Sequence, residues 1–195
     1  AAFYLARAGV DVLLLDKESW PRDKPCGDGL RAPAWPLYKE MGIWDEVLKY
    51  STPSAGVLYG APNQTFVGIR GENYPLCGPR KIIDHLVVKA AVREGAEFVE
   101  NFEVTDLIIK RGYVKGVTGI YQGRLSTIES DVVVIADGAH SRLSHKLGLY
   151  NEDPDIVFYG ARGYFEDIDE MSDMIEFFYN DIFYPAGYMW VFPMS

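Results

Sequence analysis

Cysteine and histidine are scarce in this sequence, with two cysteines and three histidines among 195 residues. Two thiols cannot build a disulfide framework, so we expect a reducing compartment in which any special cysteine has a chemical role. The histidines lack the spacing of metal ligands, and no metal site is predicted. They are His85, His140 and His145.

Basic residues are also under-represented. Lys and Arg number 19 against 28 Asp and Glu, which gives a formal net charge of −9. A nucleic-acid-binding protein normally carries a basic stripe, and its absence excludes that class of partner. No apolar run approaches the roughly 18 residues that a membrane-spanning helix needs. With 48% apolar and 24% charged residues, the composition is that of a folded globular protein.

The first sixteen residues have the pattern of half a βαβ unit. Residues 1–9 predict the second half of a helix that ends at Gly9, and residues 10–15 predict a buried strand that ends at Asp16. In a dinucleotide-binding fold, an acidic residue at this place holds the ribose hydroxyls and follows a glycine fingerprint by ~20 residues. That fingerprint would precede Ala1, so we expect an internal piece of a longer protein. The alternative for Asp16 is a side chain that caps a turn.

The remaining chain alternates between parallel α/β patterns and short antiparallel strands separated by Gly, Pro and Asn. We predict an α/β fold, in which a Rossmann-like nucleotide-binding domain (1–54 and 80–150) is interrupted by a smaller antiparallel β-rich substrate domain (55–79 and 151–195). The expected elements are a helix pair at 34–50, strands within 55–79, a helix at 81–94, three strands at 97–130 with turns near Arg111-Gly112 and Gln122-Gly123, a fully buried strand at 131–136, and aromatic strands within 156–193.

The loop that contains Cys26 is the most distinctive local feature. Two glycines and a proline surround the cysteine in Lys24-Pro25-Cys26-Gly27-Asp28-Gly29, which predicts a stiff, sharply turned loop with open backbone N–H groups. Such a loop can approach a flat cofactor ring, and the thiol could donate a proton at the reacting centre. The alternative is a small buried apolar side chain, which Cys77 fits better.

Two further places could meet a nucleotide. Arg80 precedes the helix at 81–94, where a guanidinium can clamp a pyrophosphate; alternatively it pairs with Asp84 at i+4. Asp137 and Gly138 follow the strand at 131–136, where a carboxylate can accept from hydroxyls and a glycine allows close backbone approach. The alternative there is a plain helix N-cap by Asp137 or Ser141.

Aromatic residues alternate near the C-terminal end. Tyr188, Trp190 and Phe192 would point to one face of a strand. They could line an apolar cavity or form ordinary core, together with Phe158, Tyr164, Phe177 and Phe178.

These segments together resemble the FAD-dependent geranylgeranyl reductases, within the wider aromatic-hydroxylase-like flavoprotein superfamily. Residues 1–30 resemble the stretch after that family's glycine fingerprint, and 21–29 (PRDKPCGDG) resemble its Pro-Cys-Gly-x-Gly loop. Residues 131–149 are similar to its Ala-Asp-Gly stretch, and 185–193 (PAGYMWVFP) to its Tyr-x-Trp-x-Phe-Pro substrate motif. Arg80 with Asp84 matches the Arg at the head of a family helix. Met194 stands where many members carry Lys.

The resemblance implies an enzyme that reduces carbon–carbon double bonds of a geranylgeranyl or polyprenyl lipid, with NADPH or ferredoxin as electron donor. It implies FAD bound by Asp16, Cys26, Gly27, Gly29, Arg80 and the backbone near Val104, to which the strand-end argument adds Asp137 and Gly138. Cys26 is the expected proton donor, and Tyr188, Trp190 and Phe192 the expected substrate contacts. The expected location is the cytoplasm, with a peripheral membrane contact for lipid pick-up. The alternatives are a monooxygenase or halogenase of the same superfamily, or a quinone-linked electron-relay flavoprotein.

Overall fold

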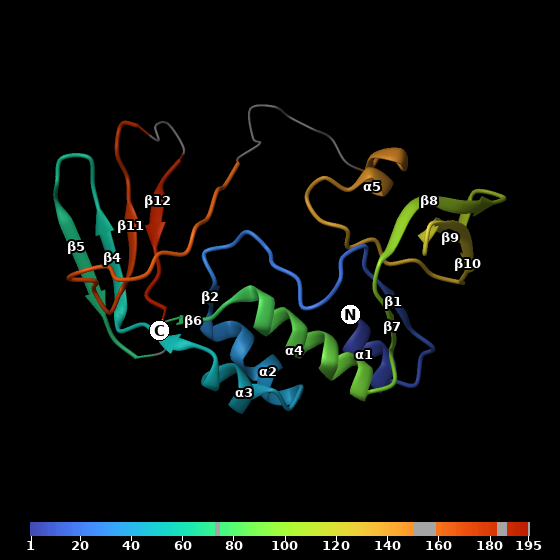
Figure 1. Ribbon diagram of the computed structural model, residues 1–195, viewed down its shortest axis with the longest axis horizontal. Helices are drawn as coiled ribbons and strands as arrows, with labels where there is room; N and C mark the ends of the chain where they lie inside the picture. Colours follow the sequence, from blue (N-terminus) through green and yellow to red (C-terminus); the bar gives the residue numbers. More distant parts are fainter. Residues whose placement is uncertain (73–74, 150–158, 183–186, 195) are drawn as a thin grey trace. The chain divides into compact units, whose positions relative to one another are not determined.

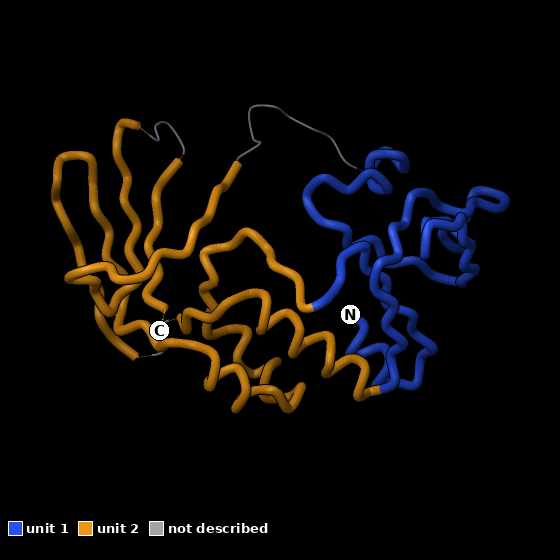
Figure 2. Tube along the Cα trace, viewed as in Figure 1, with its two compact units in different colours: residues 1–20, 95–157 blue, residues 21–94, 158–195 orange. Residues whose placement is uncertain are grey.

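The computed structural model describes residues 1–72, 75–149, 159–182 and 187–194 (Figure 1). The chain divides into two compact units, one of residues 1–20 and 95–157 and the other of residues 21–94 and 158–195 (Figure 2). These units do not have the boundaries of the predicted domains, because residues 21–54 and 80–94 group with the β-rich segments. Compactness alone does not define a domain, so the domain assignment stays a prediction.

The first unit begins with the predicted half of a βαβ unit. Helix α1 (Ala2–Arg7) is followed by Gly9 with φ +79°, a conformation that favours glycine. Strand β1 (Leu13–Leu15) then pairs in parallel with β7 (Glu97–Val99). The helix and the parallel pairing are confirmed. The predicted strand over 10–15 is too long, and it is half-buried with Leu13 exposed.

An antiparallel sheet in the order β10-β9-β8 fills most of the first unit (Figure 1). Its strands are β8 (Phe102–Lys110), β9 (Tyr113–Tyr121) and β10 (Arg124–Glu129). Both connecting turns have two consecutive residues with positive φ, at Arg111-Gly112 and at Gln122-Gly123. This is the pattern of tight hairpin turns that match the twist of the strands. Both turns are confirmed, and so are three antiparallel strands, but the predicted range 97–130 also contains β7 as a separate fourth strand.

The predicted buried strand at 131–136 is wrong. The segment has no ladder pairing among the described residues, and Val132 and Val134 are 77% and 63% exposed. Its other face does pack, since Val133 and Ile135 contact the buried cluster of Leu107, Val117 and Leu143. A strand is buried on both faces only when other elements cover both, and here one face is covered. Helix α5 (Arg142–Lys146) follows.

Helices dominate the first half of the second unit. The 3₁₀ helix η1 (Ala32–Ala34) leads into α2 (Trp35–Glu40), and α3 (Trp44–Lys49) follows after Gly42 at φ +65°. Helix α4 (Arg80–Arg93) is the longest, and it packs against α3. The helix pair and the helix at 81–94 are confirmed. Val47 of α3, Ile83 of α4 and Ile43, which precedes α3, are all almost completely buried.

Two sheets complete the second unit. A small antiparallel sheet has the order β2-β6-β3, with β2 (Gly29–Leu30), β6 (Leu76–Cys77) and β3 (Thr52–Pro53). A larger sheet has the order β12-β11-β4-β5. Its strands are β4 (Gly56–Gly60), β5 (Phe66–Arg70), β11 (Ile175–Phe178) and β12 (Met189–Val191).

The larger sheet joins distant parts of the sequence, because β11 pairs with β4. This pairing is parallel, whereas the pairs β11–β12 and β4–β5 are antiparallel. The short strands within 55–79 are confirmed, as are two of the aromatic strands. The first aromatic strand is not, since the described residues from 159 to 165 form no strand; Phe158 lies outside the described residues.

Candidate functional site

The loop with Cys26 lies in the second unit, and strand β2 anchors it. Gly29 pairs with Cys77 of β6, and the carbonyl of Asp28 accepts from Gly78 N at 2.9 Å. Cys26 is half-buried, whereas Cys77 is 1% exposed. Burial raises the pKa of Cys77 to about 12, with a further contribution from the charge of Asp28. The two thiols therefore have different chemistry, as the sequence suggested, and only Cys26 is accessible.

Asp28 is a buried carboxylate at the centre of this loop. It is 1% exposed and has φ +63°, which is uncommon for a residue other than glycine. Its Oδ2 accepts from the Tyr164 hydroxyl at 2.6 Å and from Arg162 Nη1 at 3.3 Å. Its Oδ1 accepts from the backbone N–H of Arg80 at 3.3 Å, so the carboxylate also caps the positive end of α4. A buried charge needs such partners, and the sequence analysis gave Asp28 no role.

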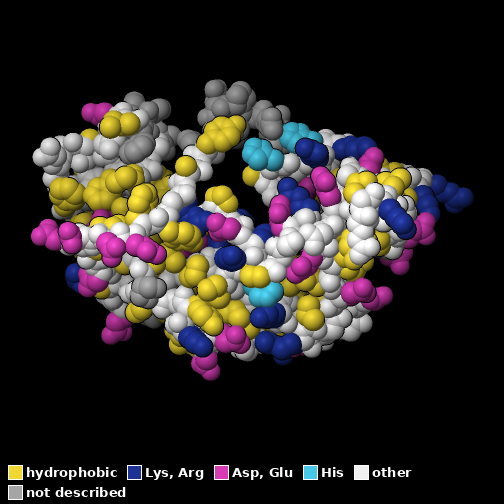
Figure 3. Space-filling view, in the orientation of Figure 1, with side chains coloured by type: hydrophobic (Ala, Val, Ile, Leu, Met, Phe, Trp, Pro, Cys, Tyr) yellow, Lys and Arg dark blue, Asp and Glu magenta, His cyan; other side chains and the backbone are white. Residues whose placement is uncertain are grey.

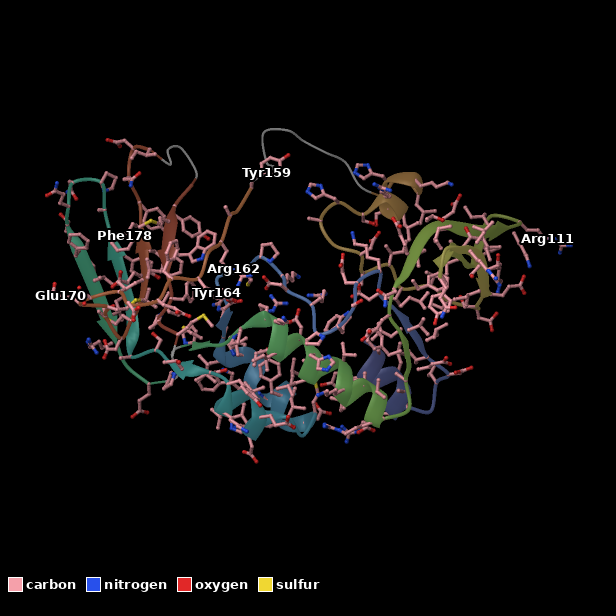
Figure 4. The ribbon with its side chains drawn as sticks, in the orientation of Figure 1. Arg111, Tyr159, Arg162, Tyr164, Glu170 and Phe178 are labelled. Atoms are coloured by element: carbon pink, nitrogen blue, oxygen red, sulfur yellow. The ribbon has the colours of Figure 1, made fainter. Side chains whose placement is uncertain are left out.

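Arg162 connects Asp28 to a second carboxylate of the loop. Its Nη2 donates to both oxygens of Asp23, at 2.7 and 2.6 Å, and its guanidinium lies 4.1 Å from the centre of the Tyr164 ring (Figure 4). The hydrogen bond from Arg162 lowers the pKa of Asp23. Burial and the hydrogen bond to Asp28 raise the pKa of Tyr164 to about 12, which keeps its hydroxyl protonated as a donor.

Arg80 makes the i+4 pair that was the alternative to a pyrophosphate clamp. Its Nε and Nη2 donate to Asp84 at 2.7 and 3.0 Å, and Arg22 Nη1 reaches the same carboxylate at 3.1 Å. Burial opposes the charged form of Arg80, but the hydrogen bonds to Asp84 and Cys26 outweigh it and raise its pKa. Two guanidiniums share one carboxylate, so this group keeps a positive charge beside Cys26. That charge fits an anionic group of a nucleotide, which leaves both readings of Arg80 open.

The aromatic motif packs directly on the glycines of the loop. A Cβ atom at Gly27 would lie 2.7 Å from Phe192 Cε2 and 3.1 Å from Trp190 Nε1, and one at Gly29 would lie 2.9 Å from Phe192 Cε1. The space that these glycines leave is therefore filled by Phe192. The structure thus brings together two motifs that lie about 160 residues apart in the sequence.

Phe192, which follows β12, is part of an aromatic face formed by β11, β12 and the residues next to β12. The ring of Phe177 lies 6.1 Å from Phe192 and 5.7 Å from Tyr188, and Tyr188 lies 5.7 Å from Trp190. The three alternating residues therefore share one face, as predicted. Tyr188 is 43% exposed, so this is a half-open face and not closed core. Phe178 points to the opposite side, where it contacts Phe66.

Other apolar side chains are visible over the larger sheet (Figure 3), and Phe66, Val67 and Ile69 of β5 are each more than half exposed. A hollow of ≈ 450 Å³ in the second unit is lined by Thr52, Phe165 and Met194, among others, and by none of the three motif aromatics.

The first unit contains the other predicted cofactor residues. Asp16 follows β1, and its Oδ1 accepts from Glu18 N at 2.9 Å, which is the turn-capping contact of the alternative interpretation. Val104 is half-buried in β8, next to an irregularity in the pairing between Val104 and Asp106 that interrupts the ladder. Both interpretations of Asp16 remain compatible with this geometry.

Gly138 and Asp137 are exposed at the end of the 131–136 segment. Gly138 has φ +94°, and no atom lies within 4 Å of a Cβ built there, so its backbone is open to a ligand. The helix cap belongs to Ser141, whose Oγ accepts from Ser144 N at 3.0 Å. The open backbone at Gly138 fits a nucleotide. At Gly27 and Gly29, this chain's own Phe192 fills the space beside the loop, so their assignment to the flavin stays a prediction.

Comparison with known proteins gives the family. Residues 1–172 match the FAD binding domain family. The chain belongs to this family. FAD is the cofactor that the family description names, and the predicted α/β class is confirmed.

Relatives with known names resemble this chain along its length. It is 28% identical over 195 residues to digeranylgeranylglycerophospholipid reductase 2 of Methanopyrus kandleri, covering 99% of this chain and 48% of that protein. A geranylgeranyl bacteriochlorophyll reductase-like protein of Thermoplasma acidophilum has a TM-score of 0.80 at 21% identity, and a flavin-dependent brominase variant has 0.79 at 23%. Each structure covers 100% of this chain, which spans half of theirs. The chain spans about half the length of the curated relatives it matches.

A membrane-spanning helix and a candidate metal cluster are both absent from the described residues. None of the helices described is both long and apolar enough to cross a bilayer. Among the same residues, no group of three or more His, Cys, Asp or Glu could hold a metal ion.

Proposed function

We propose that the protein to which this chain belongs is an FAD-dependent oxidoreductase that reduces carbon–carbon double bonds of a geranylgeranyl or other polyprenyl lipid. The observation that carries the proposal is the contact between the Cys26 loop and the aromatic motif, where Phe192 packs on Gly27 and Gly29. A proton-donating thiol and an apolar binding face are thereby parts of one site. The reductase name of the Methanopyrus kandleri relative supports the substrate class.

The chemistry divides between the cofactor and the residues of the chain. Reduced FAD, when bound, would supply the hydride that one carbon of the double bond receives. The other carbon needs a proton, and the half-buried thiol of Cys26 donates it through its Sγ. The guanidinium of Arg80 interacts with Cys26, and solvent returns the proton to the sulfur after the transfer.

Substrate binding depends on apolar contact. Each CH₂ group that leaves water contributes roughly 0.8 kcal/mol, so a long polyprenyl chain binds without much polar recognition. The half-exposed face of Tyr188, Trp190 and Phe192 offers such contact. A flat isoprenoid double bond suits stacking against these rings.

The electron donor and the location belong to the same proposal. NADPH or ferredoxin would reduce the flavin. A cytoplasmic enzyme would meet its lipid through a peripheral membrane contact, for which the exposed side chains of Phe66, Val67 and Ile69 are suited. The net charge of −9 argues against electrostatic attraction to anionic lipid, so this contact would be apolar.

The test uses the full-length protein, loaded with FAD and chemically reduced without oxygen. A geranylgeranyl lipid is added, and its mass and the flavin absorbance are followed together. A gain of two hydrogen atoms with stoichiometric reoxidation of the flavin is the expected result, and Cys26→Ala should lose the gain while keeping the flavin spectrum. An unchanged lipid with wild-type protein would refute the proposal. Oxygen with aromatic substrates, and then quinones, would next separate a monooxygenase or halogenase from an electron relay.

A further inference from the structure

One guanidinium holds both ends of the loop that carries Cys26. Arg162 donates through Nη2 to Asp23, three residues before Cys26, and through Nη1 to Asp28, two residues after it. The six residues from Asp23 to Asp28 are thus closed by a side chain 134 positions further along the chain than Asp28. The loop contains Gly27, and a glycine backbone can adopt many conformations. A side chain that binds both ends of the loop therefore restricts the conformations of the residues between them.

Tyr164 supports this arrangement from the same segment of chain. Its ring lies against the Arg162 guanidinium at 4.1 Å, and its hydroxyl donates to Asp28 at 2.6 Å. The Arg162 side chain is 10% exposed and that of Asp28 is 1% exposed. Hydrogen bonds to charged groups that are so shielded from water are stronger than those on an open surface.

We propose that Arg162 is a positioning residue for Cys26. It binds Asp23 and Asp28 on either side of the cysteine, with Tyr164 as its support, and we call this arrangement the clasp. The importance of a fixed Cys26 rests on the proposed function, but the clasp itself does not depend on it. Lys could not replace Arg here, because one compact ammonium cannot present the planar fork that reaches two carboxylates at once. Charged residues of both signs lie near the clasp. Arg80 and Asp84 form an ion pair on α4, and the positive charge of Lys81 helps to lower the pKa of Asp23.

The rate of alkylation at Cys26 reports how firmly the clasp holds the loop, and it needs no enzyme assay. The full-length, FAD-loaded protein is treated with iodoacetamide at pH 8, and the rate at each cysteine is read by peptide mass spectrometry. Cys77 is an internal reference, since it reacts only when the second unit opens. Arg162→Gln should raise the rate at Cys26 about tenfold with little change at Cys77, since hydrogen bonds to charged groups contribute at least that factor to an equilibrium.

Matched variants make the result decisive. Arg70→Gln removes another two-pronged Arg–Asp pair of the same unit, with Asp173, and should leave both rates unchanged. Arg162→Lys should behave like Arg162→Gln; a wild-type rate at Cys26 in either variant would overturn the proposal. If Arg162→Gln exposes Cys77 as well, Asp23→Asn decides, because it opens one side of the clasp at an exposed position. Selective acceleration at Cys26 supports the clasp, and an unchanged Cys26 rate overturns it.

The enzyme assay separates the two proposals. With a working reductase, Arg162→Gln should lower kcat for lipid reduction more than it changes KM, because the thiol and not the apolar face is displaced. If wild-type protein leaves the lipid unchanged while the alkylation pattern is as expected, the proposed function fails and the clasp stands. If the wild type reduces lipid and Arg162→Gln has wild-type kcat and alkylation rates, the clasp fails and the function stands.

Discussion

Replacing Gly27 by alanine tests the contact between the Cys26 loop and the aromatic motif. The new Cβ would lie 2.7 Å from Phe192 Cε2 and 3.0 Å from Cζ. Ordinary contact begins near 3.4 Å, so the ring must retreat by about 0.7 Å. Phe192 is half-buried and packs edge-on against Phe177, which limits that retreat. Overpacking of this kind costs about 1–3 kcal/mol.

A double-mutant cycle isolates the contact in the full-length protein. The free energy of unfolding is measured by urea denaturation for Gly27→Ala, Phe192→Leu and the double variant. The smaller leucine should relieve the clash. The loss of unfolding free energy caused by Gly27→Ala should therefore be smaller in the Phe192→Leu background than in the wild type, by at least about 1 kcal/mol. Gly68→Ala is the control, because its Cβ would meet only ordinary contacts from 3.6 Å outward. Effects at Gly27 and Phe192 that add to within about 0.5 kcal/mol would refute the packing argument.

Three further outcomes follow from the site. Cys26→Ala should lower lipid reduction by about 10²–10⁴-fold, the usual contribution of a positioned proton donor, whereas Cys77→Ala should not; a Cys26→Ala enzyme with full turnover would remove the thiol from the mechanism. A thiol reagent at pH 8 should modify Cys26 but not Cys77 in the folded protein, because burial raises the pKa of Cys77 to about 12, and rapid modification of Cys77 would contradict its burial. The raised pKa of Tyr164, about 12 against 10.0, means that the unfolded chain loses this proton first, so the stability from this group is present below pH 10 and is lost as the pH rises towards 12. Tyr164→Phe should remove that part of the decline, and an identical alkaline profile in both proteins would show that the hydrogen bond to Asp28 does not matter.

Local sequence patterns predicted the local structure well. The turns at Arg111-Gly112 and Gln122-Gly123 were predictable because positive φ at two consecutive residues needs particular side chains. Helix α4 was predictable because its apolar positions repeat at helical spacing up to Gly95. Residues 131–136 have the apolar content of a buried strand, but burial depends on neighbours that composition does not specify.

The site was only partly predictable for the same reason. The cysteine loop and the alternating aromatics were visible as separate motifs, and their contact needed the fold. Asp28 was visible only as an acidic residue between two glycines. Its partners Arg162 and Tyr164 lie more than 130 residues away, and nothing in the sequence marks either as a partner of Asp28.

The parallel pairing of β4 with β11 has a consequence for the order of assembly during synthesis. Strand β4 ends at Gly60 and β11 at Phe178, so at 5–20 residues per second the ribosome needs roughly 6–24 s to make the second after the first. For most of that interval, once β5 is complete at Arg70, the hairpin of β4 and β5 has an unpaired edge along β4. Such an edge is a template for unwanted pairing with other nascent chains. A chaperone that binds extended apolar segments would have its main task here, between translation of residue 70 and residue 178.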